Sequence, residues 1–516
     1  MKALLIYPKF PDTYWSFKHA LSFQGKRAAQ PPLGLMTVAS LLPKHWQKHL
    51  IDTNVERLKD SHLAWADVVL ISGMQVQQEH LISIVERCRA RGLRTVVGGP
   101  IASSLPASVL KADHIVVGEA EEIMAGLAAD LEAGTARHVY QAGERPRLEI
   151  SPLPDLSLIR MRRYSTMTVQ YSRGCPFNCE FCDIIEIYGR KPRTKEVAQV
   201  LAELDQLRQA GWRDSVFIVD DNFIGNKRRA KELLTAIIEW RKERGTRFRF
   251  ITEASLNLAD DPELLQLMAD AGFASVFLGI ETPDESSLKA THKLQNTRRD
   301  LFESIAAIQR HGIQVMGGFI LGFDTDREDI FDRMVEFIQK SAIPIAMVGL
   351  LQAMPGTQLF RRLWNEGRIL DAGGGNNTDF KLNFLPRMDA ARLVEGYTSV
   401  LQRIYSCEAY YERVKLFLSC YKQRHGQRFS LQNARALVTS LVRQGLFSRS
   451  RLSYWKFLAS ALTHHRSSFS EAMTLAVMGY HFQVMTRRLL ESAAAMPILP
   501  PSVGGYQPPS ASEASS

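Results

Sequence analysis

Residues 175–182 read Cys175-Pro176-Phe177-Asn178-Cys179-Glu180-Phe181-Cys182, and no other run in the chain is as chemically specific. Three thiolates at this C-x3-C-x2-C spacing can hold three irons of a [4Fe–4S] cluster from one loop and leave the fourth iron open. The alternatives are coincidence or a structural zinc site, which needs a fourth ligand. Since no His or Cys follows nearby to supply one, the spacing favours the cluster.

The residues around this loop alternate short apolar runs with helical patterns. Strands are predicted at 166–171, 215–219, 247–251, 275–280, 314–320 and 346–351, and helices fill the gaps, for example at 196–210 and 227–244. Six strand–helix units predict a partial (β/α)6 barrel over residues 164–370. The chemistry of such a barrel lies at the carboxyl ends of its strands.

Polar or small residues stand at those ends. Asp220, Asp221 and Asn222 close the second strand, Glu253 and Ser255 the third, and Glu281 the fourth, while Gly318 lies in the fifth. Ionised carboxylates are suitable acceptors for an ammonium group. The alternative is that such carboxylates only cap the next helix.

The cysteine run, followed in order by these motifs, resembles the radical S-adenosylmethionine (radical SAM) enzymes. The resemblance implies that SAM chelates the open iron and is cleaved by an electron from the cluster to a 5′-deoxyadenosyl radical. It implies that Phe181 lies beside the adenine and that Asp220, Asp221 and Asn222 meet the SAM amino group. Further SAM contacts are implied for Glu253, Ser255, Glu281 and Gly318, where glycine lets the backbone approach the adenine.

The first 142 residues show a second α/β rhythm, with strands predicted at 2–7, 68–72, 95–97 and 114–117 and helices at 34–42 and 80–91. This rhythm predicts a doubly wound parallel sheet, followed by a linker at 143–163. Ligands of such sheets bind outside the carboxyl ends of the strands. Those ends carry small and polar residues, namely Pro8, Ser72, Gly73, Met74, Gly98, Gly99, Pro100, Gly118 and Glu119.

A doubly wound domain ahead of a radical SAM barrel resembles the cobalamin-binding subclass. The likeness includes Pro32, Leu33 and Gly34, and it implies cobalamin contacts at these three residues and at Pro8, Ser72, Met74, Gly98, Gly99, Pro100, Gly118 and Glu119. The alternative is that these runs are ordinary turns. The D-x-H-x-x-G motif of many cobalamin folds is absent, and His19 lacks its flanking Asp and Gly. We therefore expect no histidine below the cobalt.

The combined resemblance implies that the radical takes a hydrogen from an unactivated carbon, that methylcobalamin supplies a methyl group, and that a second SAM remethylates the cobalt. The chain also resembles the hopanoid C-2 methylases, which makes a hopanoid or another lipid a candidate substrate. A small molecule is the broader alternative. Two further alternatives stay open: a rearrangement or oxidation without methyl transfer, and a cobalamin- or metal-binding sensor without turnover.

Composition places the charge outside these two domains. The 516 residues are 45% hydrophobic and 23% charged, which excludes a disordered, collagen-like or disulfide-rich chain. The net charge is +10, and residues 401–516 hold 14 basic against 5 acidic residues. This region is predicted to be a helical domain at 371–496 and a disordered tail at 497–516.

Basic helices with aromatic residues suit peripheral contact with an anionic membrane. A solvated basic face is the alternative, and nucleic acid is not expected because no RNA-binding module is recognisable. No targeting or spanning segment is visible, so we expect a cytoplasmic protein, with attachment to the inner membrane left open. The chemistry also calls for an electron donor such as ferredoxin or flavodoxin.

Overall fold

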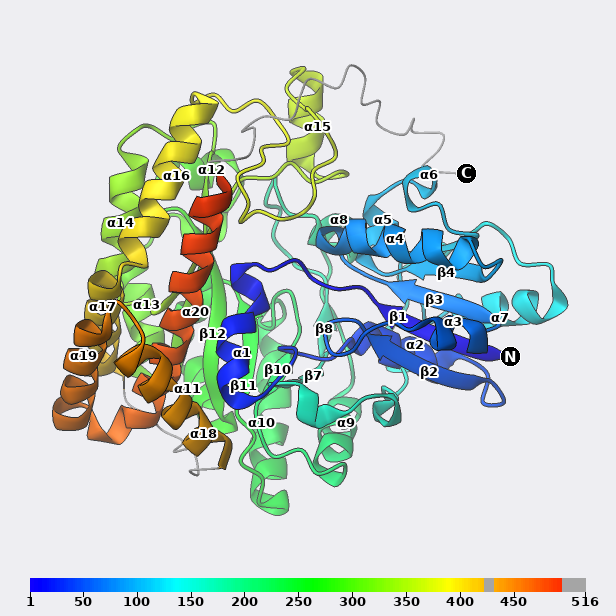
Figure 1. Cartoon of the computed structure of the whole chain (residues 1–516), viewed down its shortest axis with the longest axis horizontal. Coiled ribbons are helices and arrows are strands. Elements are labelled where there is room, and N and C mark those ends of the chain that lie inside the picture. The colour runs from blue at the N-terminus through cyan, green and yellow to red at the C-terminus, as the bar shows by residue number, and fades with distance from the viewer. Residues whose placement is uncertain (422–430, 494–516) are drawn as a thin grey trace.

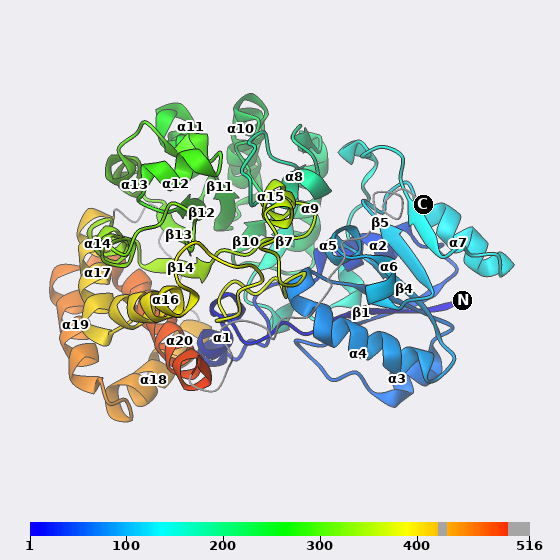
Figure 2. The same ribbon diagram turned by 90° about the horizontal axis from the view of Figure 1, so that it is seen from above.

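The computed structural model describes residues 1–421 and 431–493 (Figure 1). The predicted tail at 497–516 lies outside the described residues. An N-terminal α/β domain stands on one side of a β/α barrel and C-terminal helices stand on the other, as the view from above shows (Figure 2). The predicted fold class is confirmed.

The N-terminal sheet is parallel throughout, with its first strand inside the sheet. Its order is β2 (Gln47–Asp52), β1 (Lys2–Tyr7), β3 (Val68–Ser72), β4 (Arg94–Gly98), β5 (His114–Val117) and β6 (Val139–Gln141). The sequence prediction lacked β2 and β6. Strand β2 lies at the sheet edge and only its second half is buried, so its polar first half hid the strand pattern.

Helices cover both faces of this sheet and bury a separate apolar core on each. One face carries α2 (Leu33–Leu41) and α7 (Met124–Ala133). The other carries α3 (Asp60–Trp65), α4 (Gln78–Arg89), α5 (Pro100–Ser104) and α6 (Ala107–Leu110). The domain is therefore doubly wound, as predicted.

The barrel sheet is also parallel, and its strands follow one another in sequence order. The strands are β7 (Met167–Val169), β10 (Val216–Ile218), β11 (Phe250–Ala254), β12 (Phe273–Glu281), β13 (Gln314–Leu321) and β14 (Ile345–Leu350). The prediction placed the third strand at 247–251, which is three residues too early. Thr252 looks polar, but it is buried and its hydroxyl donates to the carbonyl of Ile218 in β10 (2.9 Å).

Helices follow the strands on the outside of the barrel. They are α9 (Val197–Gln209), α10 (Lys227–Arg244), α11 (Pro262–Ala271), α12 (Glu285–Ala290), α13 (Leu301–Arg310), α14 (Ile330–Lys340) and α15 (Gln358–Asn365). Side-chain caps fix several of their starts: Asn226 accepts from the Arg229 amide (3.2 Å), and Asp261 from the Leu264 amide (3.0 Å). Because these caps fix where the helices begin, they also fix the positions of the strand-end residues just before them.

Most of the C-terminal helices share one apolar core with the barrel, whereas residues 431–440 contribute Ala436 to a separate small cluster with Ala20 and Phe23. The C-terminal helices are α16 (Ala390–Ile404), α17 (Cys407–Cys420), α18 (Leu431–Ser440), a π-helical turn (Leu441–Leu446), α19 (Arg451–His464) and α20 (Phe469–Ala493). Buried Tyr405 also donates its hydroxyl hydrogen to the carbonyl of Ala346 in β14. Among the described helices, none combines the length and the apolar character needed to cross a bilayer.

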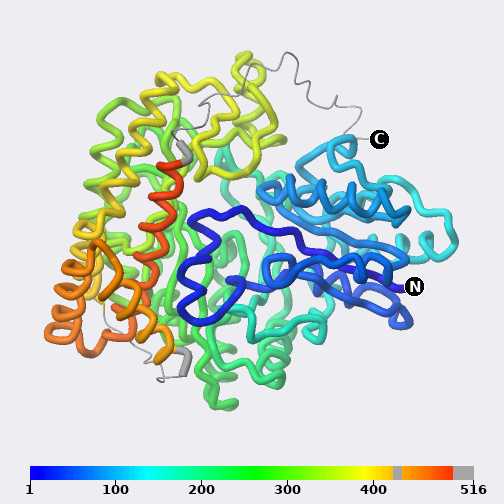
Figure 3. Tube along the Cα trace, viewed as in Figure 1, coloured from blue at the N-terminus to red at the C-terminus, as the bar shows by residue number. Residues whose placement is uncertain are grey.

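One N-terminal segment leaves its own domain. Residues Tyr14–Ser16 and α1 (Lys18–Gln24) run beside α18 and α20, where the dark-blue trace lies next to the orange and red helices (Figure 3). The Tyr14 hydroxyl bonds that of Thr486 (2.7 Å), and the Tyr14 carbonyl lies 2.9 Å from Nε2 of His481. The first and last parts of the described chain are thereby joined.

Candidate functional site

The three cysteines lie in one loop between β8 (Ser172–Arg173) and α8 (Ile184–Ile187). Strand β8 pairs with β9 (Arg193–Thr194) as an antiparallel hairpin. Gly174 has φ +91°, and a Cβ there would stand 2.7 Å from the Gly189 carbonyl oxygen. That carbonyl accepts from the Cys175 amide (3.2 Å), so only glycine lets the chain enter the loop at this point.

The donor set of this loop fits an iron–sulfur cluster. Within the part of the chain that the structure describes, no three His, Cys, Asp or Glu side chains converge on one point. Amide groups of Asn222 and Gln295 donate to the sulfurs of Cys175 and Cys179, each at 3.6 Å. Hydrogen bonds to the sulfurs are typical of cluster sites, where they tune the reduction potential.

Asp220 holds the two residues, Tyr171 and Ser172, that lead into the cysteine loop. Its buried carboxylate accepts from the amides of Tyr171 (2.8 Å) and Ser172 (2.9 Å) and from the Ser172 hydroxyl (2.7 Å). Burial raises the pKa of Asp220 to about 6, although these bonds oppose the shift. Its oxygens are committed to the backbone ahead of β8, so the structure gives Asp220 a positioning role beside the predicted contact with SAM.

Asn222 and Ser255 join the ends of two barrel strands beneath Cys175. The Asn222 amide group donates to the Ser255 hydroxyl (3.2 Å), and its carbonyl oxygen accepts from the Ser255 amide (3.3 Å). Both side chains are buried. The structure therefore brings the two predicted residues together with the first cysteine.

Glu253 and Asp221 are the two carboxylates best suited to an ammonium group. Glu253 lines a large cavity, and no described residue donates a hydrogen bond to its carboxylate. Burial, then repulsion from Asp221 and Asp220, raises the pKa of Glu253 to about 8. Burial, then Asp220, raises the pKa of Asp221 to about 7. A half-buried carboxylate that faces a cavity and has no described donor fits a site that binds the amino group of SAM.

We expect these carboxylates to make the stability of the ligand-free protein fall as the pH rises from about 5 to above 8. In that window the carboxyl groups of the unfolded state, with an ordinary pKa of about 4, have lost protons that the folded state still holds. The free energy of unfolding therefore falls as the pH rises. Glu253→Gln should raise the free energy of unfolding relative to wild type by on the order of 2 kcal/mol at pH 8 but not at pH 5, and thermal melting at both pH values measures the difference. The control is Glu56→Gln, because the Glu56 carboxylate is exposed. If Glu253→Gln changed the stability equally at both pH values, the raised pKa of Glu253 would be contradicted.

Glu281 is engaged by a lysine that sequence reasoning missed. Nζ of Lys293 lies 2.6 Å from Oε1 of Glu281 and 6.0 Å from the centre of the Phe181 ring. Burial would lower the pKa of the Lys293 ammonium, but Glu281 and the thiols of Cys179 and Cys182 raise it above its usual value. The residue gave no sequence signal because a lysine after a helix is unremarkable until its neighbours are known.

Replacing Lys293 should alter the cluster itself. Lys293→Gln removes a buried positive charge beside two ligand thiolates, which disfavours the added electron and lowers the reduction potential by on the order of 60 mV, a tenfold change for one electron. A redox titration followed by electron paramagnetic resonance measures this. The control is Lys289→Gln, whose side chain is 56% exposed. If the reduction potential of Lys293→Gln equalled that of the wild type, Lys293 would have no electrostatic influence on the cluster.

Gly318 makes room for an aromatic side chain. A Cβ at this position would stand 2.7 Å from the ring of Phe277 on the neighbouring strand. Phe277 in turn lines the cavity. The structure thus accounts for this glycine by packing, and its contact with adenine stays a prediction.

The carboxyl ends of β1 and β3 form the crevice where the strand order reverses, which is where doubly wound sheets bind ligands. Buried Gln77 ties the two ends: its amide donates to the Pro8 carbonyl (2.5 Å), and its oxygen accepts from the Met74 amide (2.9 Å). The Met74 side chain is 49% exposed. The two strand ends are thus tied together, and Met74 offers an exposed apolar side chain beside them.

Three glycines near these strand ends have different surroundings. A Cβ at Gly99, which has φ +84°, would lie 2.4 Å from the Ser72 hydroxyl, so glycine lets the loop before Pro100 pack on the end of β3. A Cβ at Gly34 or Gly118 would meet nothing within 4 Å. Of the residues predicted to contact cobalamin, Met74 lines the cavity, and the contacts themselves stay a prediction. His19 lies instead on α1 beside His481 of α20, with ring centres 5.7 Å apart.

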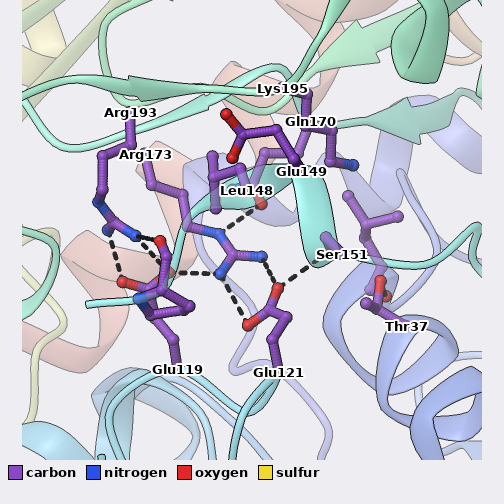
Figure 4. Close-up of polar contacts among 12 residues, drawn as sticks. Thr37, Glu119, Glu121, Leu148, Glu149, Ser151, Gln170, Arg173, Arg193 and Lys195 are labelled. Carbon is purple, nitrogen blue, oxygen red and sulfur yellow. Dashed lines mark hydrogen bonds and ion pairs between the residues drawn. The ribbon is translucent and has the colours of Figure 1, made fainter. Parts of the chain in front are cut away.

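Glu119 belongs to an ion-pair network between the two domains (Figure 4). Glu119 and Glu121 follow β5, whereas Arg173 and Arg193 lie on the hairpin that carries the cysteine loop. Arg173 pairs with Glu119 (2.6 Å) and Glu121 (2.7 Å), and Arg193 pairs with Glu119 (2.5 Å). All four side chains are at most 15% exposed. The structure gives Glu119 this domain contact, and its predicted contact with cobalamin stays a prediction.

A continuous cavity of about 2100 Å³ joins the two domains. It begins at Tyr7 and Met74 beside the crevice and passes through the barrel interior to α18 and α20. Its barrel walls are mostly apolar, with Trp15, Phe217, Ile251, Phe277, Met316 and Met347 surrounding Glu253. Ligand pockets are commonly about 300–1,000 Å³, so this cavity can hold more than one ligand.

Three segments of the chain match known families. Residues 169–338 match the radical SAM superfamily, residues 28–128 match the B12 binding domain, and residues 357–495 match a domain of unknown function (DUF4070). The chain is 33% identical to the hopanoid C-2 methylase of Rhodopseudomonas palustris over 94% of either chain. It is 43% identical to an uncharacterized methyltransferase of Synechocystis sp., covering 93% of this chain and 91% of that protein. The chain belongs to the cobalamin-binding radical SAM family.

Membership gives the chain its cofactors: a [4Fe–4S] cluster, SAM and cobalamin. A solved structure supports the fold independently. The radical SAM methyltransferase TsrM of Kitasatospora setae, with cobalamin and a [4Fe–4S] cluster bound, aligns with a TM-score of 0.61 at 15% identity, covering 96% of this chain and 100% of that one. The third matched segment begins at 357, before the predicted domain boundary at 370, so that boundary stays a prediction.

Proposed function

We propose that this radical SAM enzyme transfers a methyl group to an unactivated carbon of an apolar polycyclic lipid, of which a hopanoid is the candidate. The observation that carries the proposal is the apolar cavity that connects the crevice at β1 and β3 with Glu253. A reaction at an unactivated C–H bond needs a substrate held by shape and apolar contact, because the reacting carbon offers no polar handle. The likeness to a hopanoid C-2 methylase over most of both chains supports the lipid class.

Each part of the site then has a role for this chain's residues. Cys175, Cys179 and Cys182 would hold the cluster, and Glu253 with Asp221 would receive the amino group of SAM. Asp220, Asn222 and Ser255 position the loop and strand ends. The crevice at Pro8 and Met74 would hold cobalamin. When bound, these cofactors supply a carbon-centred radical and a methyl group, and the cavity walls would hold the substrate so that the radical meets the intended C–H bond and not another.

The reaction also needs partners. Each turnover would consume two SAM molecules, giving one 5′-deoxyadenosine and one S-adenosylhomocysteine, and would take its electrons from reduced ferredoxin or flavodoxin. We place the enzyme in the cytoplasm, in peripheral contact with the inner membrane that holds such lipids. The basic C-terminal helices support this placement.

Lipid profiling tests the substrate. Deletion of the gene should remove one methylated lipid species and accumulate its unmethylated precursor, 14 mass units lighter (about one CH₂). Restoring the wild-type gene should return the methylated species, and restoring Cys179→Ala should not. An unchanged lipid profile in the deletion strain would overturn the lipid assignment.

A further inference from the structure

A patch of exposed apolar side chains covers α18, the π-helical turn and the start of α19. Six of the fifteen large hydrophobic residues exposed in the described chain lie between 438 and 455. Phe447 is 81% exposed and Leu452 is 72% exposed. The patch, called the 438–455 patch below, consists of Val438, Val442, Leu446, Phe447, Leu452 and Trp455.

The patch is one continuous surface where the turn meets α19. The indole N–H of Trp455 donates to the Gly445 carbonyl (3.0 Å), and a Cβ at Gly445 would touch the Trp455 ring at 3.0 Å. The turn is thereby held against α19, while Leu446, Phe447 and Leu452 remain largely exposed to solvent. Exposed apolar patches of this kind mark contact sites for proteins or membranes.

Charge selects between these partners. From Arg413 to Ser470 the sequence has eleven Lys and Arg residues and no Asp or Glu. Arg449, Arg451 and Lys456 are exposed within or next to the patch. Exposed apolar side chains flanked by cations match the headgroup region of an anionic bilayer, where the cations meet phosphates and the apolar groups enter the acyl boundary.

The same helix contributes to the wall of the cavity. Ala436 and Leu437 of α18 line it, together with Leu21 and Gln24 of α1 and Val477 and Met478 of α20. The figures show α18 beside α1 at the foot of the barrel (Figure 1). Helix α18 therefore carries both Val438 of the 438–455 patch and two residues that line the cavity containing Glu253.

We propose that the 438–455 patch docks the protein on an anionic bilayer, and that the gap bounded by α1, α18 and α20 is the entrance by which a lipid passes from that bilayer into the barrel. The docking part rests on the exposed side chains and their flanking cations, and it assigns the proposed membrane contact to a particular surface. The entrance part rests on the proposed function, because it assumes a lipid substrate.

Vesicle sedimentation of the full-length holoenzyme tests the docking. Wild type should bind mixed phosphatidylcholine–phosphatidylglycerol vesicles and should bind pure phosphatidylcholine weakly. Phe447→Ser combined with Leu452→Ser should weaken binding about tenfold or more. Leu385→Ser, an exposed leucine elsewhere (41%), should leave it unchanged. Arg449→Gln combined with Arg451→Gln should weaken it about fivefold per charge, whereas Arg57→Gln with Lys59→Gln should not.

Docking is overturned if wild type does not bind the anionic vesicles, or if the patch variants bind them as wild type does. It is also overturned if the wild type sediments as a dimer that requires Phe447 and ignores vesicles, since the patch would then join two copies of the chain. Melting temperatures equal to that of wild type show that the variants are folded.

The entrance is tested by comparing lipid presentation. The Phe447→Ser/Leu452→Ser variant should lose most methylation of a lipid embedded in vesicles and retain methylation of the same lipid in detergent. Equal loss in both would overturn the entrance. If wild type docks but methylates no lipid in either form while it still releases 5′-deoxyadenosine from SAM, the lipid function fails and the docking stands.

Discussion

Cys179→Ala is expected to abolish the brown iron–sulfur absorbance of the anaerobically reconstituted protein and all formation of 5′-deoxyadenosine from SAM. The cysteine is the central thiol of the loop, it is buried, and Gln295 donates to its sulfur. A cube held by three thiolates has no spare protein ligand, so the loss of one removes the cluster rather than weakening it. Iron and sulfide analysis, the visible spectrum and the nucleoside assay measure the effect.

The matched control is Cys420→Ala, because Cys420 is an exposed cysteine outside the loop. It should retain the full iron content and full activity. Retention of the cluster by Cys179→Ala, or its loss from Cys420→Ala, would contradict the ligand assignment.

Arg173→Met should destabilise the contact between the two cofactor-binding domains by about 3–5 kcal/mol. Arg173 bridges Glu119 and Glu121, whose side chains are only 3% exposed. Removing the guanidinium leaves Glu121 buried without a charged partner and Glu119 with Arg193 alone, which is costlier than the loss of a surface ion pair. Because Arg173 lies two residues before Cys175, iron content and cobalamin affinity should fall together.

Thermal melting and limited proteolysis at the interdomain linker measure this effect. Arg361→Met is the control, since its pair with Glu186 is 56% and 38% exposed and contributes less than about 1 kcal/mol. A melting temperature for Arg173→Met equal to that of this control would show that the network does not hold the domains together.

The elements that the sequence predicted are those with a local signal. The cysteine spacing, the buried strands and the polar residues after them follow from periodicity and residue type over a few positions. Strand β2 was not predicted because it lies at a sheet edge and its first half is polar. The third barrel strand was predicted three residues too early because the hydroxyl of Thr252 finds its hydrogen-bond partner only in the folded sheet. In both cases tertiary neighbours decide the structure, and no short window contains them.

The same limit applies to the site. Asp220, Glu253 and Glu281 look alike as carboxylates at strand ends, yet the first bonds backbone amides, the second has no described donor and the third meets Lys293. Only the fold separates these three roles. The crossing of residues 14–24 to α20 and the continuous cavity were likewise invisible, because both depend on contacts between distant parts of the chain.

The central claim is radical methyl transfer, and a product balance tests it most directly. The reconstituted holoenzyme would be incubated without oxygen with a reductant, the candidate lipid and SAM carrying a deuterated methyl group. We expect 5′-deoxyadenosine, S-adenosylhomocysteine and deuterium-methylated lipid in equal amounts, with methylated lipid lost when cobalamin is omitted. Methylated lipid formed with S-adenosylhomocysteine but without 5′-deoxyadenosine would contradict it, as would 5′-deoxyadenosine formed with no S-adenosylhomocysteine.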